Sequence, residues 1–338
     1  MLTQTANVFG KLGLTWFVPF FRLAAGEDPR TQLREILMQI GVPIVAFAFF
    51  LALWGALASG VQTSLGAIPG PAEVFAEAQN LVAEHNNERA REAAFLERQE
   101  ARNARILAEN PDAEVSVRPW TGKPTYFDQI MTSLYTVFTG FALATFIAVP
   151  LGILCGLSRT FQTAINPLIQ IFRPVSPLAW LPIVTLVVSA VYVSSDPMFQ
   201  RSFIISAITV TLCSLWPTLI NTAVGVASID KDLINVSKVL RLHWYTKVMK
   251  IVLPSSLKLI FTGLRLSLGV GWMVLIAAEM LAQNPGLGKF VWDEFQNGSS
   301  SSLSRIMVAV FTIGIVGFLL DRIMATLQQL VSFGNDNA

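Results

Sequence analysis

Residues 202–229 read SFIISAITVTLCSLWPTLINTAVGVASI and contain no charged side chain. A helix needs roughly 20 consecutive apolar residues to cross the hydrocarbon core of a bilayer, so this run is long enough to span a membrane. The composition of the whole chain agrees, because 53% of its 338 residues are apolar and only 14% are charged, against about a quarter in an ordinary soluble domain. The sequence therefore predicts an all-α integral membrane protein.

Other apolar stretches on both sides of this run predict about six transmembrane helices in total. These stretches are Ile40–Ser59, Ile130–Leu157, Pro174–Ser195, Leu266–Gly288 and the shorter Ser302–Leu320.

Two segments outside these spans differ from them in composition. Residues 1–39 hold the short apolar patch Leu12–Phe21, which we expect to lie at the membrane interface. Residues 60–125 form a polar insertion in which acidic and basic side chains recur three or four positions apart, as on a solvent-exposed helix or helical hairpin. A docking surface for a partner is the other interpretation of this insertion.

The distribution of basic residues predicts the orientation, because Lys and Arg are enriched in cytoplasmic loops. With the N-terminus inside, the cytoplasmic segments hold fourteen of the 24 basic and seven of the 22 acidic residues. The outer segments then hold ten basic and fourteen acidic residues, and Glu279 lies inside a span. Both termini, including the tail 331–338, are therefore expected in the cytoplasm.

The loop that follows the opening run, residues 229–258, is patterned like a short helix. Between Asp230 and Trp244 it reads DKDLINVSKVLRLHW. Its apolar positions recur at roughly helical spacing, opposite a polar face that includes Asn235 and Arg241. Connections between helices are usually short, so nearly thirty patterned residues indicate a function for this loop.

This loop resembles the EAA signature of permeases in binding-protein-dependent ABC importers. That signature is Glu-Ala-Ala, three residues, Gly, nine residues, Ile, any residue and Leu-Pro. Here Asn235, Val236 and Ser237 stand at the Glu-Ala-Ala positions, and Arg241 stands at the Gly position. The end of the signature is matched by Ile251, Leu253 and Pro254.

The flanking spans are similar to those of permeases of the nitrate, sulfonate/taurine and bicarbonate importer family. The resemblance extends from Tyr126 to Leu330, and the whole pattern looks closest to nitrate-type permeases. It implies a MetI-like type I ABC importer transmembrane domain over residues 126–330, in a multi-pass protein of the bacterial cytoplasmic membrane. The similar segments are Pro174–Pro182, Gly263–Ser267, Ala277–Leu281 and Pro285–Gly288.

The resemblance also implies partners. We expect cytoplasmic ATPase subunits, a periplasmic solute-binding protein, a second copy of this permease in a homodimer, and surrounding lipid. ATP would be used by the ATPase, while this chain binds no cofactor, metal ion or nucleic acid. The expected cargo is nitrate or nitrite, with sulfonate, taurine or bicarbonate as alternatives within the same class.

The loop helix is expected to enter a groove on the ATPase. Arg241 could form a charge pair across that interface or lie solvated near lipid headgroups. Pro254 is expected to end the loop helix and turn the chain back toward the membrane. The residues expected to be buried in the groove are Val236, Val239 and Leu240, and those expected to make polar contacts are Asn235, Ser237 and Arg241.

Glu279 is the one carboxylate expected inside a span, and an intramembrane acid is costly. It could hold a structural hydrogen bond or hinge near the outer end of its span, or serve as a gate in the pathway. No Lys or Arg is expected inside a span, but helix N-termini can also hold an anion. A polar route between spans, or simply helix packing, could involve Ser176, Trp180, Asn221, Thr222 and Trp272.

Other functional classes find less support in the sequence. His85 and His243 lie in different segments, and no nucleophile elbow, zinc-protease motif or ATP-binding P-loop occurs, so we expect no enzymatic activity. Cys155 and Cys213 lie in apolar stretches without a metal-ligand spacing. A secondary transporter that runs without ATP is the alternative, and the patterned loop argues against it.

Overall fold

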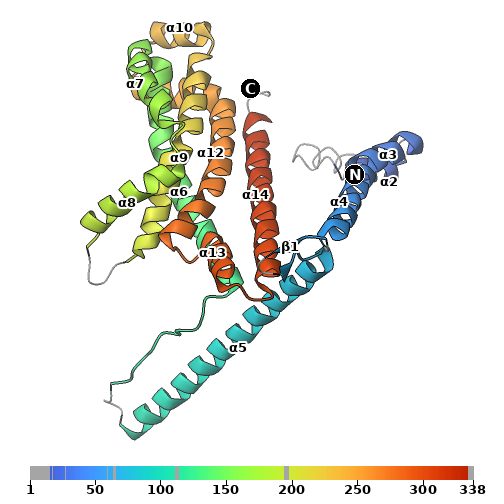
Figure 1. Cartoon of the computed structure of the whole chain (residues 1–338). Coiled ribbons are helices and arrows are strands. Elements are labelled where there is room, and N and C mark those ends of the chain that lie inside the picture. Colours follow the sequence, from blue (N-terminus) through green and yellow to red (C-terminus); the bar gives the residue numbers. More distant parts are fainter. Residues whose placement is uncertain are drawn as a thin grey trace.

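The computed structural model describes residues 16, 18–26, 28–58, 60–63, 66–110, 114–193 and 198–333, and it is almost entirely helical (Figure 1). Half of the Leu12–Phe21 patch and most of the tail 331–338 lie outside the described residues. The N-terminal elements are α2 (Val18–Ala24), α3 (Pro29–Ile36), the π-helical turn η2 (Leu37–Gly41), α4 (Val42–Ala58), the two-residue strands β1 (Gln62–Thr63) and β2 (Gly66–Ala67), and α5 (Pro71–Glu109). The elements that follow are α6 (Tyr126–Leu157), α7 (Arg159–Phe172), α8 (Pro177–Val191), α9 (Arg201–Ala227), α10 (Lys231–Val239), α11 (Trp244–Lys247), the π-helical turn η3 (Val248–Val252), α12 (Leu253–Ala282), α13 (Leu287–Asn297) and α14 (Ser302–Phe333).

The expectation of about six transmembrane helices is confirmed. Among the residues that the structure describes, five helices are long and apolar enough to cross a membrane, and α7 with α8 makes a sixth span if the bent pair counts as one. The five long helices are Pro29–Ala58, α6, α9, Trp244–Ala282 and Ser302–Val331.

The expected third span, Pro174–Ser195, is wrong as a single straight helix. Its helical part, α8, has only 15 residues, about 22 Å at 1.5 Å per residue, which is too short to cross the bilayer core. The chain instead forms α7 and α8 with a bend of 101° between them. Pro174 and Pro177 explain the break, because proline cannot donate to a helix and disfavours helix in the residue before it.

The centre of the bundle is the close packing of α6, α9 and α12. Small residues recur at every fourth position on the face of α6 that meets α9, so the two backbones approach closely. A Cβ added at Gly152 would come within 2.6 Å of Thr222 Cβ, and one added at Gly140 would come within 2.7 Å of the Ala207 carbonyl oxygen. The repeated small residues of α6 are Gly140, Ala144, Ala148, Gly152 and Gly156.

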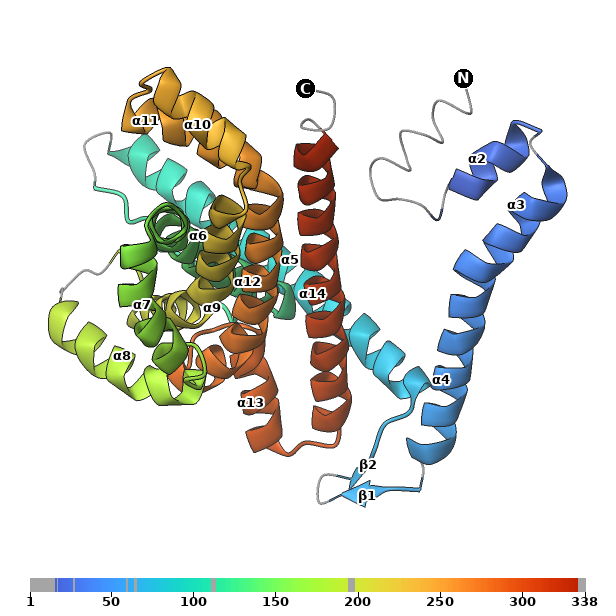
Figure 2. The same cartoon turned by 90° about the horizontal axis from the view of Figure 1, so that it is seen from above.

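Figures 1 and 2 both show α4 standing apart from the other spans. None of its most apolar window is buried inside the chain. Near its C-terminal end the Trp54 ring meets Phe311 of α14, with 5.2 Å between the centroids. This leaves the length of α4 free for lipid or another protein.

The polar insertion forms one long helix, not a hairpin. Helix α5 has 39 residues and starts with Pro71 at its first position, where the Glu73 carboxylate accepts a hydrogen bond from the Gly70 amide (3.2 Å). Proline at the first position and an acid at the third are typical helix starts. In Figure 1 α5 projects from the end of the molecule opposite α10, and residues 114–124 return beside it without regular structure.

Candidate functional site

Helix α10 presents an apolar face outward, away from the spans. Asp230 caps its start, because its carboxylate accepts a hydrogen bond from the Asp232 amide at 2.9 Å. The exposed fraction is 51% for Val236, 82% for Val239 and 63% for Leu240. Three adjacent apolar side chains exposed on one short helix are a typical protein contact surface.

The polar residues of this helix differ in where they lie. Asn235 is exposed and lines a groove between α10 and the ends of α6 and α9. Ser237 is buried and donates its hydroxyl hydrogen to the Ile234 carbonyl at 2.6 Å. Ser237 therefore faces its own chain, and the geometry does not offer it to a partner as the sequence suggested.

Arg241 ends α10 in the left-handed conformation, with a φ of 48°. Its amide donates to the Lys238 carbonyl (3.0 Å), and the Leu242 amide donates to the Ser237 carbonyl (3.0 Å). This pair of bonds is the Schellman motif, in which glycine is the usual residue at the left-handed position. The position therefore suits the glycine of the EAA signature, and the exposed Arg241 fills it instead.

The end of the loop packs against the spans. Leu253 joins an apolar cluster with Ile153 of α6, Val226 of α9 and Val252 of η3, and Ile251 is half-buried. Such packing ties the end of the loop to the bundle.

The expectation that Pro254 ends the loop helix is wrong. A single helix runs from Trp244 to Ala282, and Pro254 lies in the first turn of α12 directly after the π-helical turn η3. Pro254 has no amide hydrogen and cannot donate to the preceding helical turn. The wider η3 turn lies directly before it, so the helix continues through Pro254.

Glu279 is fully buried and holds the turn between α12 and α13 against α6. The Ser133 hydroxyl lies 2.8 and 2.9 Å from its two carboxylate oxygens, and the Gly288 amide donates to it at 3.0 Å. The Ser133 oxygen in turn accepts the Leu287 amide at 2.9 Å. A Cβ added at Gly286 would come within 2.1 Å of this carboxylate, so the turn fits closely around the acid. The arrangement is that of a structural hydrogen-bond centre.

The other candidate pathway residues do not form one cluster. Asn221 donates to the Pro217 carbonyl within α9 (2.8 Å), and the buried Trp272 donates its indole hydrogen to the Ile313 carbonyl of α14 (3.0 Å). Thr222 is fully buried against Gly152. These three residues pack helices together.

Ser176 and Trp180 lie instead at the bend between α7 and α8. The Ser176 hydroxyl accepts the Leu178 amide at 3.3 Å, and the Trp180 ring lies 5.7 Å from that of Phe172.

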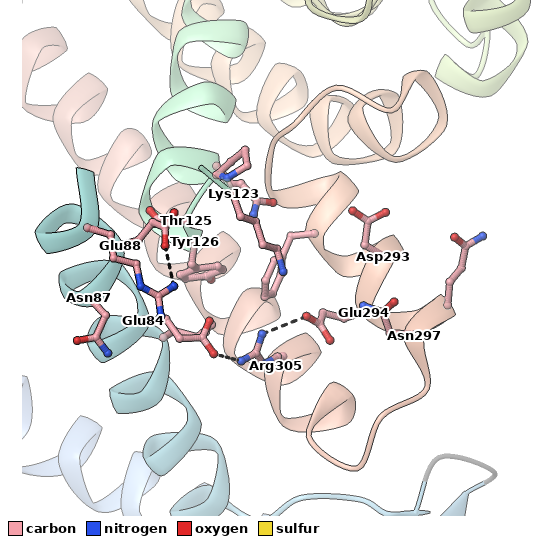
Figure 3. Close-up of a pocket in the computed structure, with 16 residues that line it drawn as sticks. Glu84, Asn87, Glu88, Lys123, Thr125, Tyr126, Asp293, Glu294, Asn297 and Arg305 are labelled. Carbon is pink, nitrogen blue, oxygen red and sulfur yellow. Dashed lines mark hydrogen bonds and ion pairs between the residues drawn. The ribbon is translucent and has the colours of Figure 1, made fainter. Parts of the chain in front are cut away.

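A cluster around Arg305 was missed by sequence reasoning. Arg305 of α14 pairs with Glu77 (2.8 Å) and Glu84 of α5 and with Glu294 of α13 (3.4 Å). Figure 3 shows its guanidinium pointing between Glu84 and Glu294 at the edge of a cavity of about 540 Å³. The only sequence signal was the spacing of Glu77 and Glu84, which are seven positions apart and hence on one face of α5.

Comparisons with known proteins agree with this architecture. Residues 148–333 match the family described as binding-protein-dependent transport system inner membrane component. The bicarbonate transport system permease protein CmpB of Synechococcus elongatus is 34% identical over 302 residues, which cover 88% of this chain and 91% of that protein. The nitrate import permease protein NrtB of Synechocystis sp. is 40% identical over 203 residues, which cover 60% of this chain and 69% of that protein.

A solved structure of the methionine ABC transporter MetNI in inward-facing conformations aligns with a TM-score of 0.51 and 15% identity, over 61% of this chain and 95% of that one. That likeness confirms the MetI-like fold. Together with the family match over residues 148–333, the findings show that this chain belongs to the family of inner-membrane permease components of binding-protein-dependent transport systems.

Proposed function

We propose that this chain is the permease subunit of an ATP-driven importer of a small planar oxyanion, with nitrate as the cargo and bicarbonate as the alternative. Relatives at 40% and 34% identity are described as permeases for nitrate and for bicarbonate. Both anions carry one negative charge on a trigonal group of similar size. A sulfonate such as taurine is the more distant alternative.

The exposed apolar face of α10 is the observation that carries this proposal. Val236, Val239 and Leu240 would fill a groove on a cytoplasmic ATPase, because exposed apolar side chains gain most from being covered. Helix α10 leads into the long helix Trp244–Ala282 at the centre of the bundle. Closure of two ATPases would then move two permease copies between inward-open and outward-open states. With α10 and both termini inside, α5 lies on the side of the solute-binding protein.

The test is uptake by proteoliposomes that contain the permease, its ATPase and its binding protein. We expect labelled nitrate to enter only when ATP is available to the ATPase. Val239→Asp should reduce both uptake and co-purification of the ATPase, because it places a charge in the apolar contact. Uptake without ATP would contradict the proposal and indicate a secondary carrier, while ATP-driven uptake of bicarbonate and not nitrate would change the cargo alone.

Val117→Asp is the matched control. Val117 is 76% exposed, close to the 82% of Val239, but it lies in the segment that returns beside α5. The same substitution there should leave ATPase co-purification unchanged. A Val239→Asp complex that keeps the ATPase and transports normally would show that α10 is not the coupling surface.

A further inference from the structure

The bend between α7 and α8 lies at the side of the bundle, about halfway along α9 (Figure 1). The apolar side of α7, formed by Phe161, Ile165 and Ile169, packs against α6 and α9. Its last residue, Phe172, stacks on Trp216, with 6.4 Å between the centroids and 10° between the planes. Trp216 is close to the midpoint of α9, which runs from Arg201 to Ala227 and is long and apolar enough to cross the membrane. The bend therefore sits near mid-membrane depth.

Arg173 follows Phe172 directly and occupies this bend. Its guanidinium is exposed, and no carboxylate of the residues that the structure describes lies within ion-pair distance of it. A charged side chain near the bilayer centre is costly and is found facing water or a counter-charge, not lipid. The sequence placed Arg173 in a cytoplasmic segment just before the expected third span. If α7 and α8 form one broken span, Arg173 lies within that span instead.

A polar stripe extends from Arg173 along α7. Gln162, Asn166 and Gln170 recur every fourth residue and hence share one face of the helix. With Arg173 they line a cavity of about 690 Å³, whose opposite wall is formed by α6 and α9. The stripe leads from the bend toward the start of α7, which follows the end of α6 at Ser158. Amide and guanidinium groups are the donors that an oxyanion needs.

The N-terminus of α8 does not serve this purpose as well. Ser176 caps it, and its hydroxyl and carbonyl oxygens accept the Leu178, Ala179 and Trp180 amides. Its first-turn donors are thus already occupied, which leaves Arg173 as the available positive group at the bend.

We infer that the bend between α7 and α8 is the anion site of the permeation pathway, with Arg173 supplying the charge and the polar stripe of α7 leading the anion onward. This inference rests on the proposed function. It assigns the class of ligand to small monovalent oxyanions, since a single guanidinium balances a single negative charge. Broken membrane helices are a recurrent place for substrate sites in transporters.

The experiment compares Arg173→Gln and Arg173→Lys with Arg159→Gln in the reconstituted complex with ATPase and binding protein. Arg173→Gln should lower the rate of nitrate uptake about tenfold or more, which corresponds to about 1.4 kcal/mol. It should leave the ATPase activity stimulated by the loaded binding protein near the wild-type value. Arg173→Lys should retain most uptake, and Arg159→Gln, the same change at the other end of α7, should retain all of it.

Three results separate this inference from the proposed function. Normal uptake by Arg173→Gln would overturn the anion site and leave the importer standing. Equal loss of uptake and ATPase activity in both Arg173 variants would also overturn it, since it would indicate a structural role. Wild-type transport of bicarbonate but not nitrate would replace the cargo, and loss of bicarbonate uptake in Arg173→Gln would still support the site.

Thiol labelling provides an independent measurement in a variant with Cys155 and Cys213 replaced by Ala. Gln170→Cys should react with a water-soluble anionic thiol reagent, and nitrate should slow the reaction. Leu168→Cys should stay unreactive, because Leu168 is exposed on another side of α7 and would face lipid. Equal reactivity of the two thiols, or no effect of nitrate, would overturn the inference.

Discussion

Arg241 occupies a backbone conformation that glycine adopts without strain. A non-glycine residue there costs about 1–2 kcal/mol, while glycine would add about 0.5–1 kcal/mol of unfolded-chain entropy and lose about 0.3–1 kcal/mol of favourable charge at the helix C-terminus. These terms nearly cancel. Arg241→Gly should therefore leave the thermal stability of the purified permease almost unchanged.

The same variant tests what the guanidinium does. Arg241 is exposed beside Val239 and Leu240, so we expect it to reach the ATPase. Arg241→Gly should then lower ATP-driven uptake several-fold although the fold is intact. Unchanged uptake would place the side chain among lipid headgroups instead.

Glu279 provides a second prediction at this scale. Glu279→Ala would leave the Ser133 hydroxyl and the Gly288 amide buried without their acceptor, at about 1–3 kcal/mol each. Glu279→Gln keeps the volume and one carbonyl oxygen, so it should lower the melting temperature less. A melting curve of each variant in detergent measures this order. The reverse order would show that the carboxylate is not a hydrogen-bond centre.

At the scale of elements, Arg305 joins three helices. Arg305→Ala would leave Glu77, Glu84 and Glu294 close together with no positive charge between them, and breaking a largely buried pair from one side is strongly destabilising. We expect α5 to loosen from α13 and α14, which limited proteolysis within α5 would detect. Arg91→Ala is the control, because the exposed Arg91–Glu88 pair should contribute little.

The bend between α7 and α8, and the absence of a helix end at Pro254, mark the limit of prediction at this scale. Hydropathy along residues 159–191 falls at Arg173, so the sequence indicated the start of a span there. It could not show that α7 packs beside α6 and makes the first half of that span. The prediction that a helix ends at Pro254 was wrong for a different reason. The π-helical turn η3 lies directly before Pro254, and the helix continues through it.

At the scale of the whole molecule, the number of spans and the family followed from local sequence. Uncharged runs such as residues 202–229 and the Ile251–Pro254 ending needed no knowledge of distant contacts. The Arg305 cluster needed such knowledge, because Arg305 and Glu77 are 228 positions apart. The Glu279 site could be predicted only in part. The sequence indicated the buried acid, but not its partner Ser133, which lies 146 positions away.

The orientation of the molecule yields a further prediction. Single cysteines at Tyr245 and Val117, both exposed, would report the two ends. Val117→Cys should react with a membrane-impermeant thiol reagent in intact spheroplasts, while Tyr245→Cys should react only after permeabilisation. The opposite pattern would place the termini outside.

The helix from Trp244 to Ala282 has 39 residues, so it is about 58 Å long at 1.5 Å per residue. If an ATPase docks on α10 as proposed, this helix would act as a rigid rod between the docking surface and the turn that holds Glu279. A tilt of about 5° about one end displaces the other by about 5 Å, as much as one helical turn. The turn that is hydrogen-bonded to Glu279 would then move with the helix, and no chain of small rearrangements between the two ends would be needed.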